Sequence, residues 1–182
     1  MNVVYRGLPN PMTISFAGIS DDKVSASAPG LTRATGTGKY NLNPGSGTEV
    51  KVSVTAKLPD GKPVSDSKIF RIKNIPAPAG AIGGVIGVQK GAKSRLEVSQ
   101  ISAQLQDFLY DLNFQVTRFS FKVPGQAAII VSGDRVNAQC KAALARATKG
   151  DQISIFDIKT KIMGTTANIV PKDAAPVIYE IQ

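Results

Sequence analysis

The sequence predicts a mainly β protein of two tandem domains: an immunoglobulin-like β-sandwich, followed by a β-rich domain with one or two short α-helices. Three observations lead to this prediction. Short segments alternate apolar and polar residues with a period of two, as half-buried strands do. Clusters of turn-forming residues separate these segments, and the 182 residues include 17 Gly and 11 Pro. The third observation is a proline-rich spacer between two such β-rich stretches.

The spacer reads Ile75-Pro76-Ala77-Pro78-Ala79-Gly80. Each proline fixes its own φ and restricts the preceding residue, so the segment is semi-extended and stiffer than a Gly/Ser tether. The expected division is a domain over 1–75, a linker over 76–80 with Pro76, Pro78 and Gly80 as its key residues, and a domain over 81–182. A domain of roughly 75 residues buries only about 60% of its unfolded surface, so contact with a neighbour or a second copy would stabilise it.

Strand signals follow one another closely in the first domain. Apolar residues alternate with polar ones over 14–16, 24–28 and, most clearly, 50–54. Asp60-Gly61 lies between two prolines and predicts a hairpin turn into a returning strand at 69–72. Further turn clusters occupy 8–11, 20–22, 28–30 and 43–47. Six or seven short strands without a helix signal predict the sandwich, here without a disulfide.

The second domain mixes strand and helix signals. Apolar residues near helical spacing predict one helix over 94–107 and another over 134–148, with Asp134 at the start of the second. Strands are expected over 82–88, 112–116, 119–123, 127–131, 153–158 and 177–181. The alternation changes parity between Thr117 and Arg118, and again between Ile155 and Phe156. Such a change predicts a β-bulge, or a strand covered on both faces.

The absence of histidine narrows the possible chemistry. Nucleophilic triads, most zinc sites and most proton shuttles at neutral pH use that residue. The carboxylates are scattered among turns, so nothing favours a paired-carboxylate glycosidase, although sequence alone leaves that class open. Asp21-Asp22 lacks the alternating oxygen ligands of a calcium loop. We therefore predict that the protein is not an enzyme and has no catalytic residue, cofactor or metal.

Two other signals have ordinary explanations. The only cysteine, Cys140, shares a helical stripe with Val136, Leu144 and Ala147, which predicts a small buried residue on a packed helix face. The glycines over 80–87 and the stretch 91–94 lack the spacing of a dinucleotide or phosphate loop. We expect turns at both places.

The charge points to a protein partner. The formal net charge is +9, from 22 basic and 13 acidic residues spread over both domains. Nucleic-acid binders concentrate basic residues and interleave aromatics, whereas this chain has no Trp and no basic run, so we predict no nucleic acid. Attraction to an acidic protein explains the charge better. Four basic residues alternate with apolar ones on expected strands and predict a partner-contact face: Arg118, Lys122, Lys159 and Lys161.

No membrane or targeting segment is visible in the sequence. No apolar run approaches the roughly 18 residues that a transmembrane helix needs. The chain begins with the strand-like residues Val3, Val4 and Tyr5 rather than with a signal peptide. We expect a fragment of a longer protein, with any anchor upstream.

The opening segment, Asn2–Ser15 with Gly18 after it, resembles a periplasmic module of the gliding-motility and type IX secretion proteins GldM and PorM. Its Tyr-x-Gly-x-x-Asn-Pro motif is moderately specific. The similarity continues through the proline linker, through Phe119-Ser120-Phe121, and through Asp157-Ile158-Lys159 with Gly164 downstream. It spans nearly the whole chain.

This resemblance implies a homodimeric, non-enzymatic periplasmic shaft that transmits force. In that family a transmembrane helix and two periplasmic domains precede these two domains. The shaft would link an inner-membrane, proton-driven motor subunit, through that missing part, to ring lipoproteins at the outer membrane, through the C-terminal domain. The residues themselves leave an alternative open, an extracellular immunoglobulin-like module that binds a ligand or carbohydrate. Sparse aromatics, at 6%, count against a sugar-stacking surface.

Overall fold

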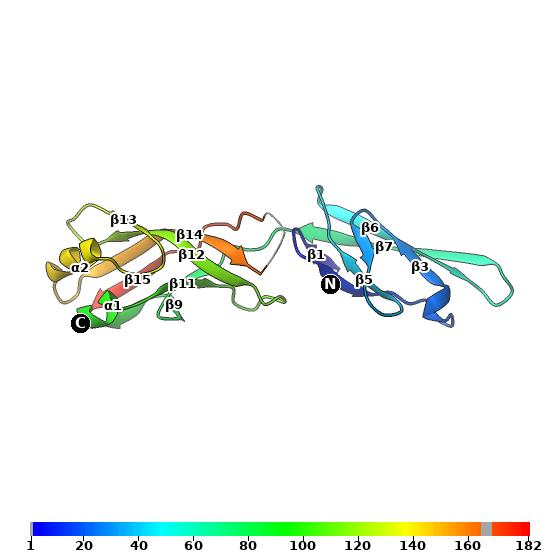
Figure 1. The fold of residues 1–182 in the computed structure, drawn as a ribbon, viewed down its shortest axis with the longest axis horizontal. Helices are drawn as coiled ribbons and strands as arrows, with labels where there is room; N and C mark the ends of the chain where they lie inside the picture. Colours follow the sequence, from blue (N-terminus) through cyan, green and yellow to red (C-terminus); the bar gives the residue numbers. More distant parts are fainter. Residues whose placement is uncertain (1, 165–168) are drawn as a thin grey trace. The chain divides into compact units, whose positions relative to one another are not determined.

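The computed structural model of this chain describes residues 2–164 and 169–182 (Figure 1). The chain divides into two compact units, Met1–Ile75 and Pro76–Gln182, each with its own hydrophobic core. Strands dominate both units, and two short α-helices occur in the second. The predicted fold class, mainly β with one or two short helices, is confirmed.

The N-terminal unit is a sandwich of two sheets. Its elements are β1 (Val3–Tyr5), β2 (Asn10–Thr13), the 3-10 helix η1 (Asp21–Lys23), β3 (Val24–Ser27), β4 (Leu31–Arg33), β5 (Lys39–Leu42), β6 (Glu49–Lys57) and β7 (Pro63–Lys73). One sheet has the strand order β1-β7-β6-β3 and the other has β2-β5-β4. Strand β1 runs parallel to β7, whereas the other described pairs are antiparallel. Alternate residues of β6 and β5, among them Val50, Val52 and Leu42, are buried between the sheets.

The strands predicted over 24–28 and 50–54 are confirmed, but the strand predicted over 14–16 is wrong. Strand β2 ends at Thr13, and Phe16 pairs only with Ile19 across the tight turn at Gly18, whose φ is +76°. The predicted turn over 8–11 also overlaps β2. A proline fits there because β2 is the outer strand of its sheet, where a missing N–H costs no ladder hydrogen bond.

The returning strand predicted over 69–72 is longer than expected, since β7 begins at Pro63. The middle of β7 is polar, so the first part of this strand shows no alternation of apolar and polar residues in the sequence. Asp66 and Lys68 lie opposite Val54 and Val52 of β6, and so on the sheet face that carries the core residues, yet both are exposed. Charges on the inner face of an exposed strand discourage pairing with another chain.

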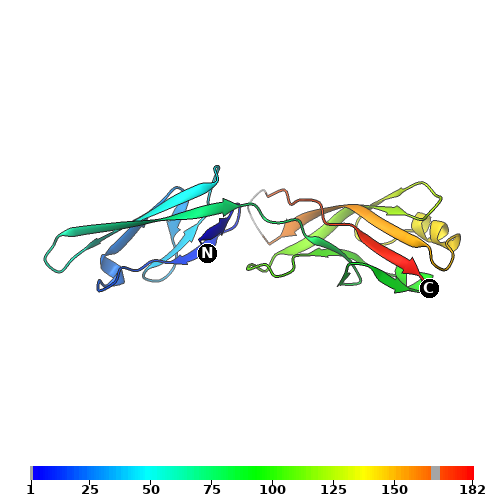
Figure 2. The ribbon, with the colours of Figure 1, turned by 180° about the vertical axis from the view of Figure 1, so that it is seen from behind.

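The described residues of the C-terminal unit form two sheets and two helices around one core. Its elements are β8 (Ala79–Ile82), β9 (Val85–Ile86), β10 (Gln89–Gly91), α1 (Lys93–Glu97), β11 (Ile101–Gln104), β12 (Asn113–Lys122), β13 (Ile129–Ser132), α2 (Ala138–Ala145), β14 (Gln152–Met163) and β15 (Val177–Ile181). The larger sheet has the order β10-β15-β14-β12-β13 and the smaller has β11-β8-β9. Figure 2 shows β15 beside β14. The predicted terminal strand over 177–181 is confirmed.

The prediction that Gly80 belongs to the linker is wrong. Gly80 lies in β8, is buried, and pairs with Ala103 of β11. Its backbone N–H donates to the carbonyl of Ala175 at 3.1 Å, and a Cβ at this position would lie 2.4 Å from that oxygen. Glycine is therefore required here by close backbone packing, and not by freedom in a spacer.

Both predicted helices are shorter than expected. The segment 94–107 contains α1 only at its start and then β11, where Ile101 and Ala103 alternate with polar residues and pair with β8. The segment 134–148 contains α2, whose N-cap is Asn137, not Asp134. The side chain of Asn137 accepts a hydrogen bond from the Cys140 N–H at 3.0 Å.

Two predicted strands are also revised. The segment 82–88 is not one strand, because Gly83 and Gly84, both with positive φ, turn the chain between β8 and β9. The strand predicted over 127–131 lies instead over 129–132, as β13.

The parity changes on β12 and β14 correspond to β-bulges, the first of the two alternatives that the sequence left open. Pairing shifts between Val116 and Arg118, and again between Arg118 and Ser120. Thr117 is the extra residue on β12, and Asp157, with a φ of +49°, lies within the compensating irregularity on β14. Because the two bulges lie on opposite strands, the pairing regains its register beyond them.

Tyr179 on β15 offers a test of this core. Its side chain is fully buried and donates a hydrogen bond to the Ala92 carbonyl at 3.1 Å. Burial raises the pKa of Tyr179, with Arg95 acting in the opposite direction. The folded protein therefore holds this proton at pH values where the unfolded chain loses it, so its contribution to stability is complete below about pH 10 and is lost as the pH rises above that.

We expect Tyr179→Phe to cost about 1 kcal/mol of unfolding free energy at pH 7, because it removes one buried hydrogen bond. The variant should also lose less stability than the wild type between pH 9 and about pH 11. Urea unfolding followed by circular dichroism at both pH values measures the two effects. If the variant lost as much unfolding free energy as the wild type on going from pH 9 to about pH 11, the raised pKa would not belong to Tyr179.

Candidate interaction surface

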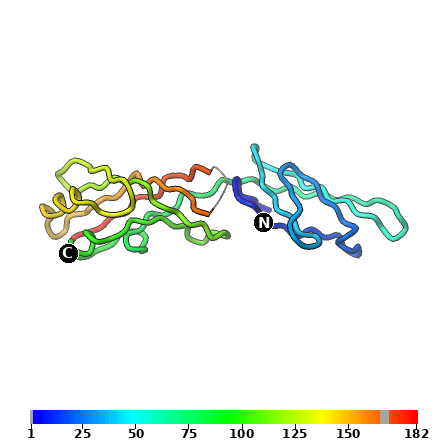
Figure 3. The backbone as a smooth tube through the Cα atoms, viewed as in Figure 1, coloured from blue at the N-terminus to red at the C-terminus, as the bar shows by residue number. Residues whose placement is uncertain are grey.

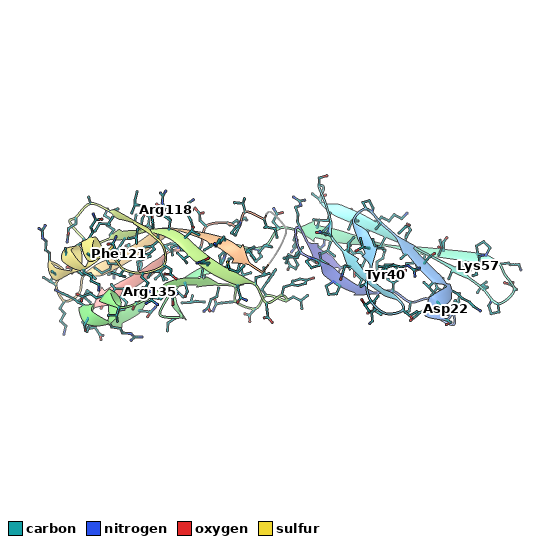
Figure 4. All side chains as sticks on the ribbon, in the orientation of Figure 1. Asp22, Tyr40, Lys57, Arg118, Phe121 and Arg135 are labelled. Atoms are coloured by element: carbon teal, nitrogen blue, oxygen red, sulfur yellow. The ribbon has the colours of Figure 1, made fainter. Side chains whose placement is uncertain are left out.

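The four basic residues singled out from the sequence lie on one face of the larger sheet. Arg118 of β12 and Lys159 of β14 are direct cross-strand partners, so their side chains point to the same side. Lys122 and Lys161 follow at even spacing along the same two strands and share that side. Phe121 points to the opposite side and is fully buried. Figure 4 labels Arg118 and Phe121. We call Arg118, Lys122, Lys159 and Lys161 the basic sheet face.

The charges of this face are not equivalent. Lys159 Nζ forms an ion pair with Asp173 Oδ2 at 2.5 Å, which neutralises it locally. Among the residues that the structure describes, Arg118, Lys122 and Lys161 have no carboxylate within ion-pair distance. All three are exposed. The unpaired positive charge available to a partner therefore comes from these three side chains.

Apolar side chains interrupt the basic sheet face, and the sequence search missed them. Ile130 of β13, Ser120 of β12 and Phe156 of β14 lie in one cross-strand row. Ile130 is 59% exposed, whereas Ser120 is only 4% exposed between its larger neighbours. The Ser120 hydroxyl donates to Asp157 Oδ2 at 3.3 Å. Ordinary alternation was the available signal, because Ile153 and Ile155 are buried and Phe156, at the next position, turns to the opposite face.

The described residues offer little for catalysis. No group of three or more Cys, Asp or Glu in residues 2–164 and 169–182 is placed to hold a metal. Asp22 accepts a hydrogen bond from the Ser20 hydroxyl, which lowers the pKa of its carboxyl. Cys140 is buried, as predicted, and burial raises the pKa of its thiol, so the nucleophilic thiolate is disfavoured. No described helix is long and apolar enough to cross a membrane.

The fold therefore defines a class, that of proteins built from consecutive mainly-β domains. Comparison with protein families specifies it further. The family model of the GldM C-terminal domain matches residues 76–182, and that of the GldM third domain matches residues 1–73. The chain belongs to the GldM family, as two consecutive domains of that protein. This membership indicates a component of the gliding-motility and type IX secretion machinery.

Several solved structures are similar to this chain at low identity. The fibronectin(III)-like modules of Clostridium thermocellum CbhA share 15% identity, cover 99% of this chain and 87% of their own, and have a TM-score of 0.33. The human desmocollin-1 ectodomain shares 12% identity over 100% of this chain and 38% of its own, with a TM-score of 0.28. Human protocadherin-24 EC1-2 shares 10% identity, covering 88% and 81%, with a TM-score of 0.22. No curated protein matches the sequence at a significant level.

Proposed function

We propose that this chain is a non-enzymatic periplasmic shaft segment of the type IX secretion and gliding machinery. It belongs to an inner-membrane-anchored, homodimeric protein and passes force from a proton-driven motor to ring lipoproteins at the outer membrane. The observation that carries this proposal is the match of both units to consecutive GldM domains. The absence of a cluster of metal-ligating side chains among the described residues is compatible with it.

The strand topology of the N-terminal unit supports a force-bearing role. Its first strand, β1, runs parallel to its last strand, β7, over three residue pairs. Two further backbone hydrogen bonds extend this contact, Arg71 N–H to Asn2 O at 3.0 Å and Arg6 N–H to Lys73 O at 2.8 Å. Tension applied at the two ends of the unit would shear these parallel strands, so all the hydrogen bonds between them bear the load together and do not open one at a time.

The C-terminal unit has a related arrangement near its first strand. Ala79 of β8 bridges in parallel to Ala175, just before β15. Gly80 N–H donates to Ala175 O at 3.1 Å, and Ala175 N–H donates to Pro78 O at 2.8 Å. The last strand, β15, is also parallel to β10. Tension between the ends of this unit would likewise be borne by hydrogen bonds between parallel segments.

We assign the contact with the outer-membrane ring lipoproteins to the basic sheet face. Three unpaired cations combine long-range attraction with the apolar area of the exposed Ile130 and the half-buried Phe156, which lie on either side of Ser120. Charged residues at the rim of an interface raise the association rate and set specificity, whereas apolar centres supply most of the affinity. The ring surface that fits this face is acidic with an apolar centre.

Reversing two of these charges in the full-length protein tests the assignment. The double variant Lys122→Glu and Lys161→Glu should weaken binding to the purified ring lipoproteins about tenfold or more at physiological salt. The matched control, Lys141→Glu and Lys149→Glu, makes the same charge change at α2 and at the exposed turn after it. The control should bind like the wild type in surface plasmon resonance.

Two outcomes would count against these proposals separately. Unchanged binding by the Lys122 and Lys161 variant would remove the basic sheet face as the contact. The second outcome concerns cells whose GldM-family protein has been shortened by deleting the segment that corresponds to residues 1–182. Normal secretion and gliding in these cells would refute the proposed shaft function. In contrast, loss of both activities with the motor still assembled is the expected result.

A further inference from the structure

The N-terminal unit contains a groove that the proposed shaft function does not use. It has a volume of about 660 Å³ and lies where η1, β3, β4 and the β6–β7 hairpin meet. Its walls are formed by Asp22, Lys23, Val24, Ser25, Arg33, Thr55, Ala56, Lys57, Leu58, Pro59, Gly61 and Pro63. Figure 4 labels Asp22 and Lys57 at this end of the unit, and Figure 3 traces the backbone that forms it.

The walls of the groove are positively charged. Lys23, Arg33 and Lys57 contribute three positive charges and Asp22 one negative charge, which leaves a net charge of +2. The hydrogen bond from the Ser20 hydroxyl is the main cause that lowers the pKa of Asp22, so its carboxylate is charged at neutral pH and the net charge of +2 holds there. All four side chains are exposed, and none of the three cations forms an ion pair within 4.0 Å in the described part of the chain.

One of these cations is held in place by an aromatic ring. The guanidinium carbon of Arg33 lies 5.8 Å from the centroid of the Tyr40 ring, which is itself only 4% exposed. Stacking of this kind orients an arginine while its N–H groups stay free to bind a carboxylate in a bidentate manner. The groove therefore presents at least one cation in a defined position.

Apolar side chains and two outer strands border the groove. Val24 and Ala56 are buried beneath it, and Leu58, Pro59 and Pro63 add apolar wall. Strand β3 is the outer strand of one sheet and β4 the outer strand of the other. An outer strand directs half of its N–H and C=O groups away from its own sheet, where an extended peptide can pair with them.

We propose that this groove binds an extended acidic segment of a partner protein. Its carboxylates would lie against Lys23, Arg33 and Lys57, and its alternate apolar side chains against Leu58 and Pro59. A sugar fits less well, because no aromatic residue is among the described ones that line the groove, and the Tyr40 ring lies buried under Arg33. The exposed edge of β7 is a poorer docking strand, because Asp66 and Lys68 occupy the inner face there.

The test uses the 182-residue chain and a defined probe, a fluorescein-labelled octapeptide of alternating Glu and Val. Anisotropy titration at physiological salt should show saturable binding, which weakens in 0.5 M salt because screening shortens the range of the charges to a few ångström. The same peptide with Lys in place of Glu should not bind. The double variant Arg33→Glu and Lys57→Glu should bind the acidic peptide at least about tenfold more weakly.

A matched control distinguishes binding in the groove from nonspecific attraction to the net positive charge of the protein. Lys51→Glu with Lys68→Glu makes the same charge change on β6 and β7, outside the groove, and should bind like the wild type. Lys23→Glu, on η1, is a second groove variant and should weaken binding in the same direction. The unfolding midpoints of all variants should lie within a few degrees of the wild-type value, since the altered side chains are exposed and the contact of Arg33 with the Tyr40 ring contributes only modestly to stability.

Three results would overturn the proposal. The first is a loss of peptide binding in the Lys51 and Lys68 control as large as the loss in the groove variants. The second is the absence of peptide binding at about 1 mM protein. The third is binding of an acidic oligosaccharide, such as polygalacturonate, that is tighter than binding of the acidic peptide. None of these outcomes bears on the shaft function, which is tested through the C-terminal unit and in cells.

Discussion

Replacing Phe121 with alanine is expected to destabilise the C-terminal unit by about 3–5 kcal/mol. The ring is fully buried in the core, on the inner face of β12, and its cross-strand partners are Ile155 of β14 and Ile129 of β13. The truncation removes most of a large apolar side chain and leaves a cavity at the centre of a close-packed sheet. Small domains are stable by only about 5–15 kcal/mol, so this loss is a large fraction of the total.

Hydrogen exchange measured by mass spectrometry can assign this loss to one unit. In the Phe121→Ala variant, peptides from residues 101–182 should lose protection, whereas peptides from residues 1–75 should keep it, because the two units have separate cores. Lys122→Ala, at the next position on the same strand but exposed, should change stability by less than about 0.5 kcal/mol. A loss below about 1 kcal/mol for Phe121→Ala would contradict the core packing described here.

In the N-terminal unit, the largest effect is expected from Asn10→Ala, at about 2–4 kcal/mol. Asn10 is 2% exposed, and its side-chain carbonyl accepts from the Tyr5 N–H at 2.8 Å. Its amide group lies within hydrogen-bond distance of the backbone carbonyls of Tyr5, Leu8 and Leu42, at 2.8–2.9 Å. The side chain thus closes the turn between β1 and β2 and ties it to β5.

Alanine at this position leaves buried backbone groups without the partner that Asn10 supplied, and that desolvation cost is the source of the expected loss. Urea unfolding of the whole chain, with exchange protection read from peptides of residues 1–75, measures it. Asn43→Ala is the matched control, because Asn43 is an exposed asparagine in the same unit. Equal stability of the two variants would show that the Asn10 hydrogen bonds contribute nothing to the fold.

The features that sequence reasoning predicted well depend on local patterns. Strands over 24–28 and 50–54 alternate strictly, and the strand over 177–181 alternates except at Ile178; half-buried strands need only such alternation to be visible. The β-bulges at Thr117 and Asp157 were also visible, because an extra residue reverses which side chains face the core. Burial of Cys140 followed from helical spacing on one short helix.

The features that sequence reasoning missed depend on partners that are distant along the chain. The segment 94–107 has helical spacing by coincidence, and pairing with β8 makes β11 a strand. Gly80 looked like a spacer residue, yet the approach of Ala175, far along the chain, makes it a packing position.

For the surfaces, the sequence alone determined which residues are basic and that four of them form two pairs at even spacing, Arg118 with Lys122 and Lys159 with Lys161; the pairing of β12 with β14 puts both pairs on one face. The tertiary structure decided the rest: Lys159 is neutralised by Asp173, Ile130 joins the face from β13, and Lys23, Arg33 and Lys57 line one groove. The physical reason is that alternation is set by backbone geometry within a strand. Charge pairing and grooves depend instead on which strands become neighbours, and long-range packing selects those neighbours.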